Sequence, residues 1–129
     1  MSGKETVLIV DDDPTTIMLI KHYLEGISVA TLVAPNGPSA LEILHTHSDQ
    51  IGLVFLDIAM PHMNGYQLCE AIRADSALAS LPVVAVTARS SPDMDAEARS
   101  VGINEVIPKP FKPSVIRDAL ERHGLVAPE

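Results

Sequence analysis

Unbroken apolar runs that end on polar residues constrain the fold of this chain more than any other feature. The run from Ile51 to Leu56 is rich in branched side chains and shows no alternation of apolar and polar positions. A strand with this pattern has both faces buried, as in a parallel sheet with helices above and below. The run ends on Asp57, so a charge appears only at the carboxyl end of the predicted strand.

Four further apolar runs have the same character, at positions 6–10, 29–33, 82–86 and 105–108. Between the runs, apolar residues at helical spacing predict helices at 14–25, 38–46, from 64 or 65 to 74, 92–101 and 113–123. The first predicted helix has typical boundaries. It begins at Pro14 with Asp13 before it as the N-cap, and Gly26 follows its end. Five strands that alternate with five helices predict an α/β fold, a doubly wound five-stranded parallel sheet in the flavodoxin-like order 2-1-3-4-5.

Size and composition limit the classes of protein to which this chain can belong. Its 129 residues fit one domain, expected to span 1–129 with a core of about 6–123. The net charge of −8 disfavours direct binding to nucleic acid or an anionic membrane and favours a cation or a basic partner. One cysteine, Cys69, excludes an internal disulfide framework and is expected to be a buried apolar residue. The N-terminal apolar segment is too short for a signal or membrane helix, so we expect a cytoplasmic protein.

On the predicted topology, the polar residues at the strand ends converge on one edge of the sheet. They are Asp11 and Asp12 after the first strand, Asp57 after the third, Thr87 after the fourth and Lys109 after the fifth. A lone aspartate after an apolar run usually caps a turn, but this convergence favours a site. Three carboxylates so close repel one another, which raises their pKa values or calls for a hard cation such as Mg²⁺. A metal, a lysine and a hydroxyl around one carboxylate suit phosphoryl transfer, with Asp57 as the nucleophile that forms an acyl phosphate.

The chain resembles the receiver domain of bacterial two-component response regulators, a phosphoacceptor domain in signal transduction, over nearly its whole length. In that family an acidic pair follows the first strand, which corresponds here to Asp11 and Asp12. The phosphoacceptor lies in a D-x-x-M-P-x-M-x-G loop, found here from Asp57 to Gly65. A serine or threonine follows the fourth strand, and the sequence K-P-F follows the fifth, found here as Thr87 and as Lys109 to Phe111.

This resemblance implies roles for the site residues. Asp12, Asp57 and the backbone carbonyl of Ala59 would hold Mg²⁺, and Asp11 would orient a water on the metal. Lys109 and Thr87 would contact the phosphoryl oxygens. The peptide bond between Lys109 and Pro110 is often cis in the family, in keeping with a tight turn that presents the lysine.

The resemblance also implies partners and a regulatory role rather than substrate turnover. A sensor histidine kinase or a His phosphotransfer protein would donate the phosphoryl group, in a two-component system or phosphorelay. The domain would catalyse its own phosphotransfer and a slow autodephosphorylation. A downstream protein would bind the face formed by the fourth helix, fifth strand and fifth helix. No effector domain follows the last predicted helix, so we expect output by protein contact.

The sequence departs from the family pattern beside the site. Val106 stands three positions before the lysine, where the family usually carries an aromatic switch residue. Ala59 and Arg89 occupy the variable positions two residues after Asp57 and two after Thr87, and we expect them to tune the lifetime of the phosphate. His62, in the acceptor loop, is expected to face solvent and is not assigned to the site.

Two other functions fit parts of the sequence. The stretch Asp11 to Thr15 matches D-x-D-x-T, the first motif of haloacid-dehalogenase-type phosphatases, with Asp11 as nucleophile and Asp13 as acid/base. That hypothesis leaves Asp57 and its loop unexplained, finds no acidic motif at a late strand and leaves no room for a cap domain. A degenerate receiver that acts only as a docking module is the other alternative, which Val106 favours and the complete set of site residues opposes.

Overall fold

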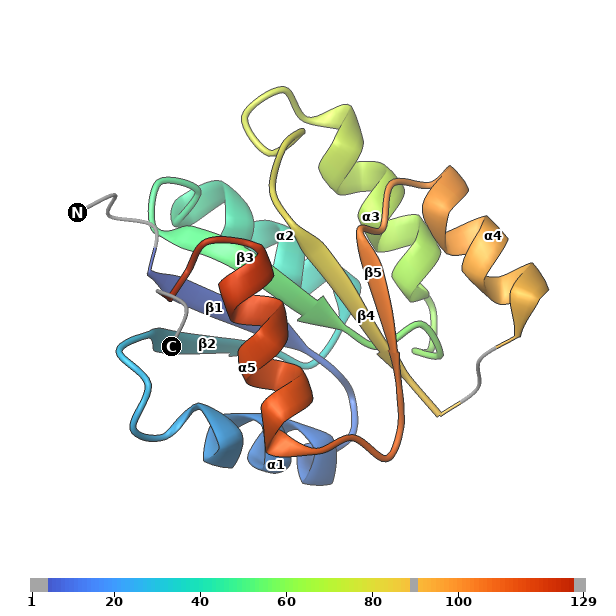
Figure 1. The fold of residues 1–129 in the computed structure, drawn as a ribbon. Coiled ribbons are helices and arrows are strands. Elements are labelled where there is room, and N and C mark those ends of the chain that lie inside the picture. The colour runs from blue at the N-terminus through green and yellow to red at the C-terminus, as the bar shows by residue number, and fades with distance from the viewer. Residues whose placement is uncertain (1–4, 89–90, 127–129) are drawn as a thin grey trace.

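Residues 5–88 and 91–126 are described by a computed structural model, in which the strands form one parallel sheet of five (Figure 1). The strand order is β2-β1-β3-β4-β5, as predicted. The strands are β1 (Thr6–Val10), β2 (Ala30–Ala34), β3 (Ile51–Leu56), β4 (Val83–Thr87) and β5 (Glu105–Pro108). The helices are α1 (Pro14–Leu24), α2 (Gly37–Thr46), α3 (Gly65–Ala74), α4 (Pro92–Ser100) and α5 (Pro113–Arg122).

Helices cover both faces of the sheet, with α2, α3 and α4 on one face and α1 and α5 on the other (Figure 1). Alternate residues of β3 point to opposite faces. Val54 and Leu56 belong to the apolar cluster beneath α2 and α3, whereas Leu53 and Phe55 belong to the cluster beneath α1 and α5. All four side chains are at most 1% exposed. The apolar run of β3 therefore marks a strand buried on both faces, as expected.

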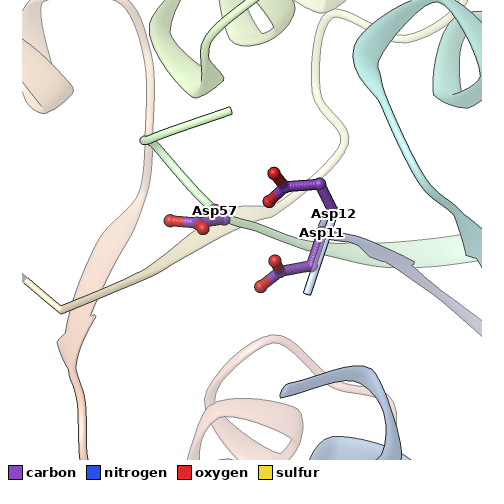
Figure 2. A group of neighbouring side chains, drawn as sticks. All are labelled: Asp11, Asp12 and Asp57. Carbon is purple, nitrogen blue, oxygen red and sulfur yellow. The ribbon is translucent and has the colours of Figure 1, made fainter. Parts of the chain in front are cut away.

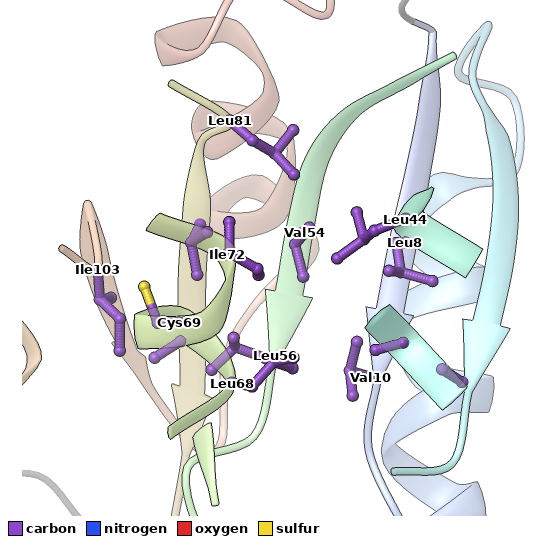
Figure 3. Close-up of a cluster of buried hydrophobic side chains, with 14 of the residues drawn as sticks. Leu8, Val10, Leu44, Val54, Leu56, Leu68, Cys69, Ile72, Leu81 and Ile103 are labelled. Atoms are coloured by element: carbon purple, nitrogen blue, oxygen red, sulfur yellow. The ribbon is translucent and has the colours of Figure 1, made fainter. Parts of the chain in front are cut away.

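Cys69 lies in the cluster beneath α2 and α3 and is fully buried, as predicted. Figure 3 shows its sulfur among the side chains of Leu68, Ile72 and Ile103. Burial raises the pKa of the Cys69 thiol, which keeps it neutral. Cys69 therefore behaves as a small apolar core residue.

Two strands begin one residue later than the sequence predicts. Val29 makes its backbone hydrogen bond within a turn, so β2 begins at Ala30 and extends to residue 34. Pro82 has no N–H to donate to a ladder, so β4 begins at Val83. The shift matters at the other end of β4, because Thr87 becomes the last residue of the strand instead of the first residue after it.

α3 has the predicted bounds, whereas each of the other four helices differs from its predicted bounds by one residue at one end. The predicted last residues of α1, α4 and α5 are C-caps outside the helices: Glu25, Val101 and His123. α2 begins one residue early, because the Asn36 side chain caps it. The predicted N-cap of α1, Asp13, is confirmed and accepts the Thr15 N–H at 3.0 Å. Within the described parts of the chain, no helix is long and apolar enough to cross a membrane.

Candidate functional site

The carboxyl ends of β1 and β3 lie side by side and hold two aspartates at one edge of the sheet. β1 pairs with β2 on one side and β3 on the other, so the sheet reverses its winding here. The ladder continues past the strand ends: the Asp57 N–H donates to the Val10 carbonyl at 3.0 Å, and the Asp11 N–H donates to the Ala34 carbonyl at 3.2 Å. Backbone pairing therefore positions Asp11 and Asp57 independently of any contact between their side chains.

Asp12 completes a group of three carboxylates (Figure 2). One oxygen from each of Asp11, Asp12 and Asp57 lies within 4.8 Å of the other two. Asp11 is 2% exposed and Asp57 is 8% exposed, whereas Asp12 is exposed to solvent. The structure thus brings the three predicted carboxylates together, two of them buried and the third open to solvent.

The loop after β3 is built tightly around Asp57. The Asp57 side chain accepts the N–H of Ala59 at 3.2 Å. Gly65 closes the loop by donating its N–H to the Ile58 carbonyl at 2.9 Å. A Cβ at position 65 would lie 2.7 Å from the Asp57 carbonyl oxygen and 2.8 Å from the Ile58 Cα. Only glycine leaves room for this approach, so the last residue of the D-x-x-M-P-x-M-x-G motif has a steric role.

A capping box fixes where the loop ends and α3 begins. The Asn64 side chain accepts the Gln67 N–H at 2.9 Å, and the Gln67 side chain accepts the Asn64 N–H at 2.9 Å. Both bonds satisfy backbone groups that the first turn of a helix otherwise leaves unpaired. The acceptor loop is therefore held at both ends, by the β3 ladder and by the capped start of α3.

Lys109 approaches the carboxylates from the loop after β5. Its Nζ lies 3.6 Å from Oδ2 of Asp11 and 3.9 Å from Oδ2 of Asp57. The Lys109–Pro110 peptide bond is cis, as expected. Phe111 is buried and packs edge-on against the Tyr23 ring, with the ring centroids 5.8 Å apart. The K-P-F sequence thus supplies one cation to the site and one aromatic anchor to the core.

Thr87 lies at the same edge of the sheet as Lys109. It is 2% exposed and pairs with Pro108 of β5. Its carbonyl accepts the Lys109 N–H at 2.8 Å. The predicted hydroxyl and the predicted lysine are therefore joined through the backbone at the ends of neighbouring strands.

The electrostatics of the site follow from burial of like charges. Burial raises the pKa of Asp11 to about 6, and the neighbouring Asp57 and Asp12 add to the effect, while the Asp13 N–H and Lys109 oppose it. Burial also raises the pKa of Asp57, against the opposing effect of Lys109. The lysine compensates only part of the clustered negative charge.

This donor set fits Mg²⁺. The three side chains offer carboxylate oxygens close together, and hard oxygen ligands are those that Mg²⁺ takes in proteins. The raised pKa values of Asp11 and Asp57 indicate a deficit of positive charge that a divalent cation would correct. The exposed Asp12 leaves a path from solvent, which an ion that keeps several waters needs.

The remaining residues singled out in the sequence lie around this centre. Ala59 is exposed in the acceptor loop. His62 is also exposed, as expected, and has a left-handed backbone with φ of 68°. Val106 is partly buried, lies opposite Ala85 of β4 and packs against the cluster beneath α2 and α3. Arg89 lies outside the described residues.

Two structural contacts of the site region had no clear signal in the sequence. Tyr66, the second residue of α3, donates its hydroxyl to the Met94 carbonyl in the first turn of α4 at 3.4 Å. Met63 of the acceptor loop packs against Gly37, where a Cβ would lie 2.4 Å from the Met63 sulfur. The glycine and methionine positions were visible as loop residues, but their partners lie in other elements.

The arrangement matches a known family. Residues 7–121 match the family described as response regulator receiver domain. The chemotaxis protein CheY of Pseudomonas aeruginosa is 38% identical over 117 residues, which cover 90% of this chain and 93% of that protein. The heme response regulator HssR of Staphylococcus saprophyticus is 33% identical over 107 residues, which cover 83% of this chain and 46% of HssR. The chain therefore belongs to the receiver domain family of response regulators.

Solved structures agree with this assignment. The chemotaxis response regulator CheY4 of Vibrio cholerae superposes with a TM-score of 0.84 at 27% identity, covering 92% of this chain and 97% of that one. The signal receiver domain of a signal transduction histidine kinase from Syntrophus aciditrophicus superposes with a TM-score of 0.83 at 31% identity. The match covers 97% of this chain and 95% of that one. The flavodoxin-like fold is confirmed, and the chain is a phosphoacceptor signalling domain of the kind found in two-component systems.

Proposed function

We propose that Asp57 is the residue that accepts the phosphoryl group. The observation that carries this proposal is the position of Asp57, buried at the reversal point of the sheet with Lys109 Nζ 3.9 Å from its Oδ2. Ligands bind at this point of open α/β sheets, outside the carboxyl ends of the strands. One carboxylate oxygen of Asp57 forms a bond to phosphorus while the bond from phosphorus to the donor nitrogen breaks.

The neighbouring residues neutralise and orient the transferred group. Lys109 supplies a positive charge to the phosphoryl oxygens, and Thr87 supplies a hydroxyl donor. The Ala59 N–H, already bound to Oδ1 of Asp57, orients the carboxylate. Little further covalent chemistry is asked of the protein, so the domain would catalyse its own phosphorylation and, with an oriented water, its slow autodephosphorylation.

Mg²⁺ is part of this proposal. Receiver domains bind Mg²⁺ at aspartate clusters of this kind, and Asp11, Asp12 and Asp57 would hold it here, with the Ala59 carbonyl as a further ligand and Asp11 orienting a water. When bound, the ion supplies positive charge to the phosphoryl oxygens. In the metal-free protein, the positive charge of Lys109 offsets part of the repulsion between Asp11 and Asp57.

The proposed partners are those that the resemblance implies. A sensor histidine kinase or a His phosphotransfer protein would donate the phosphoryl group, and a downstream protein would bind the face of α4, β5 and α5. Several relatives are named as chemotaxis proteins, in keeping with a role in signalling. One domain over residues 1–129 and a cytoplasmic location remain predictions from the sequence.

The phosphatase alternative loses support at Asp13. Both oxygens of that side chain are occupied at the start of α1, where Oδ1 accepts the Thr15 N–H at 3.0 Å and Oδ2 accepts the Thr16 hydroxyl at 3.2 Å. A residue that caps a helix in this way is poorly placed to act as an acid/base at Asp11. The family assignment likewise favours Asp57.

The test is chemical trapping of the phosphorylated residue. Acetyl phosphate with Mg²⁺ should add the mass of one phosphate, and borohydride should reduce the acyl phosphate at Asp57, located by peptide mass spectrometry. Asp57→Asn should abolish the added mass. Asp13→Ala is the matched control: it should lose a helix cap, worth about 1 kcal/mol, and still accept phosphate on Asp57. Label on Asp11 would overturn the assignment.

A further inference from the structure

α4 is the helix least buried in the described part of the fold, and its attachment to α3 is uneven. Among its residues only Ala98 is fully buried, and its first turn carries Asp93 and Asp95. In Figure 1, α4 lies beside α3 at the outer side of the sheet. Two side chains of α3, Tyr66 and Arg73, bind backbone carbonyls at the two ends of α4. α4 also packs against β5 and, through Ala98, against the apolar cluster, so these two attachments are its polar links to α3.

The attachment at the carboxyl end of α4 is strong. The Arg73 guanidinium donates to the Gly102 carbonyl from Nη2 at 2.7 Å and from Nε at 3.1 Å. It also donates to Oδ1 of Asn104 at 2.9 Å and to the Leu81 carbonyl at 2.7 Å. Charge-assisted bonds from one rigid fork hold the segment after α4 in a single place.

The attachment at the amino end of α4 is weak. The Tyr66 hydroxyl points at the Met94 carbonyl at 3.4 Å, which is longer than the usual O–H···O range of about 2.5–3.0 Å. The pKa of Tyr66 is raised by burial and by the neighbouring Glu97 and Asp95, so the phenol keeps the proton that it donates. Both Tyr66 and Met94 are only partly buried. A small displacement of either residue would therefore break this contact.

Tyr66 is joined directly to the acceptor. The preceding residue, Gly65, lies against the backbone of Asp57 and Ile58 so closely that no Cβ fits between them. A movement of the acceptor loop must therefore move Gly65, and with it the start of α3. On the β5 side of α4, Val106 is a short β-branched side chain with a restricted χ1, so it lacks the reach of an aromatic switch residue.

We propose that Tyr66 couples the state of Asp57 to the position of α4, which pivots about its Arg73-bound end when the contact between Tyr66 and Met94 is lost. The proposal rests on Asp57 as the phosphoacceptor. In the unmodified protein the tyrosine holds the first turn of α4 against α3. Phosphorylation displaces the acceptor loop and Gly65, breaks the contact and frees that turn. The phosphoryl group shifts this equilibrium because it interacts differently with the two positions of the loop.

The chain allows a direct optical test of this contact. It has no tryptophan and two tyrosines, Tyr23 and Tyr66, so Tyr23→Phe leaves Tyr66 as the only tyrosine. Beryllofluoride with Mg²⁺ should change the fluorescence of Tyr66 in that variant, because the hydroxyl loses its carbonyl partner. An unchanged spectrum at saturating beryllofluoride would overturn the proposal.

A second measurement separates coupling from phosphorylation. In Tyr66→Phe, which keeps the ring and loses the hydroxyl, the α4 amide resonances of the free protein should already lie part of the way toward their beryllofluoride-bound positions. The remaining shift on adding beryllofluoride should fall to less than about half of the wild-type shift, and resonances from 102 to 104 should change little. Tyr23→Phe is the matched control and should shift as the wild type does.

Phosphorylation of the same variants by acetyl phosphate keeps the two proposals distinguishable. Tyr66→Phe should gain the mass of one phosphate to the same extent as the wild type. If it does so and its α4 resonances shift as far as those of the wild type, Tyr66 does not couple the two sites. If neither protein gains the mass, the assignment of Asp57 fails first, and the coupling proposal fails with it.

Discussion

Gly65 leaves no room for a side chain in the acceptor loop. Adding a single methyl group at this position tests whether the loop needs that close backbone approach to fold and to accept phosphate. In Gly65→Ala the new Cβ meets backbone atoms of Asp57 and Ile58, which cannot move without displacing the end of β3. We expect a loss of about 2 kcal/mol in the free energy of unfolding, as for other overpacked sites, and slower phosphorylation by acetyl phosphate. Urea unfolding and the rate of mass gain measure the two effects.

Gly37→Ala is the control for this substitution. Its Cβ would meet only side-chain atoms of Met63, and the two closest, Sδ and Cγ, can turn away by rotation of that flexible side chain. The loss of stability should therefore be clearly smaller than for Gly65→Ala. Equal losses in the two variants would mean that the acceptor loop yields as easily as a methionine side chain.

The raised pKa of Asp11 predicts how the free energy of unfolding depends on pH. Its folded-state pKa is about 6, above the ordinary value of 3.8, so the folded protein holds this proton more tightly than the unfolded chain does. The free energy of unfolding therefore falls, through this group, as the pH rises from about 4 to about 6. Above about pH 6, Asp11 is ionised in both states and its loss of unfolding free energy no longer grows with pH. Asp11→Asn should be more stable than the wild type at pH 7 in EDTA.

The pH profile of the difference is the decisive measurement. The advantage of Asp11→Asn should shrink as the pH falls through 6 toward 4 and should disappear only below the ordinary pKa of 3.8, where the wild-type carboxyl is protonated in both the folded and the unfolded state. A difference in unfolding free energy that stays constant from pH 4 to pH 7 would contradict a buried, raised-pKa carboxyl at this position.

At the scale of elements, Arg73 links α3 and the loop that follows it to the turn after α4, which is distant in the chain. It binds carbonyls of the loop before β4 and of the turn after α4, including those of Leu81 and Gly102. Arg73→Met would leave these buried or half-buried acceptors without a donor, so we expect a loss of about 3 kcal/mol in unfolding free energy. Chemical denaturation of both proteins measures it.

Two further variants show whether the guanidinium fork or its charge matters. Arg73→Lys keeps the charge and cannot reach several carbonyls at once, so it should recover less than half of the loss. Arg99→Met, on the exposed face of α4, should change stability by less than about 0.5 kcal/mol. Full stability in Arg73→Lys would show that a point charge is enough.

At the scale of the whole molecule, the acidic cluster lowers the stability of the metal-free protein, and Mg²⁺ binding should restore it. Asp11 and Asp57 stay buried with Lys109 as their nearby cation, so the metal-free protein folds against their repulsion. Mg²⁺ at about a hundred times its dissociation constant should add roughly 2.7 kcal/mol to the free energy of unfolding. Thermal melts should show a clear rise with millimolar Mg²⁺ and none with NaCl at the same ionic strength.

Variants of the cluster give the converse result. Asp57→Asn and Asp12→Ala should melt above the wild type in EDTA, because each removes one of the repelling charges, and both should gain less from Mg²⁺. Melting temperatures equal to that of the wild type in EDTA, for both variants, would count against the charge-cluster account of this site.

Sequence patterns alone were enough to predict the element types, the strand order and the convergence of Asp11, Asp57 and Lys109. These follow from local patterns, because an unbroken apolar run indicates burial on both faces and a polar residue at its end must lie at the sheet edge. The family assignment confirms the resulting fold and general function. Strand ends were shifted by one residue at Ala30 and Val83, because the ladder begins where a partner strand can pair.

The residues that hold the elements together became visible only when the elements were packed in three dimensions. Tyr66 and Met94 are 28 positions apart, and Arg73 and Gly102 are 29 apart, and neither pair is marked by periodicity or by a motif. Both contacts depend on how closely α3 and α4 pack on the sheet. A local pattern reports whether a side chain is buried, but the partner of a polar side chain is set by the distance between elements, which no stretch of sequence encodes alone.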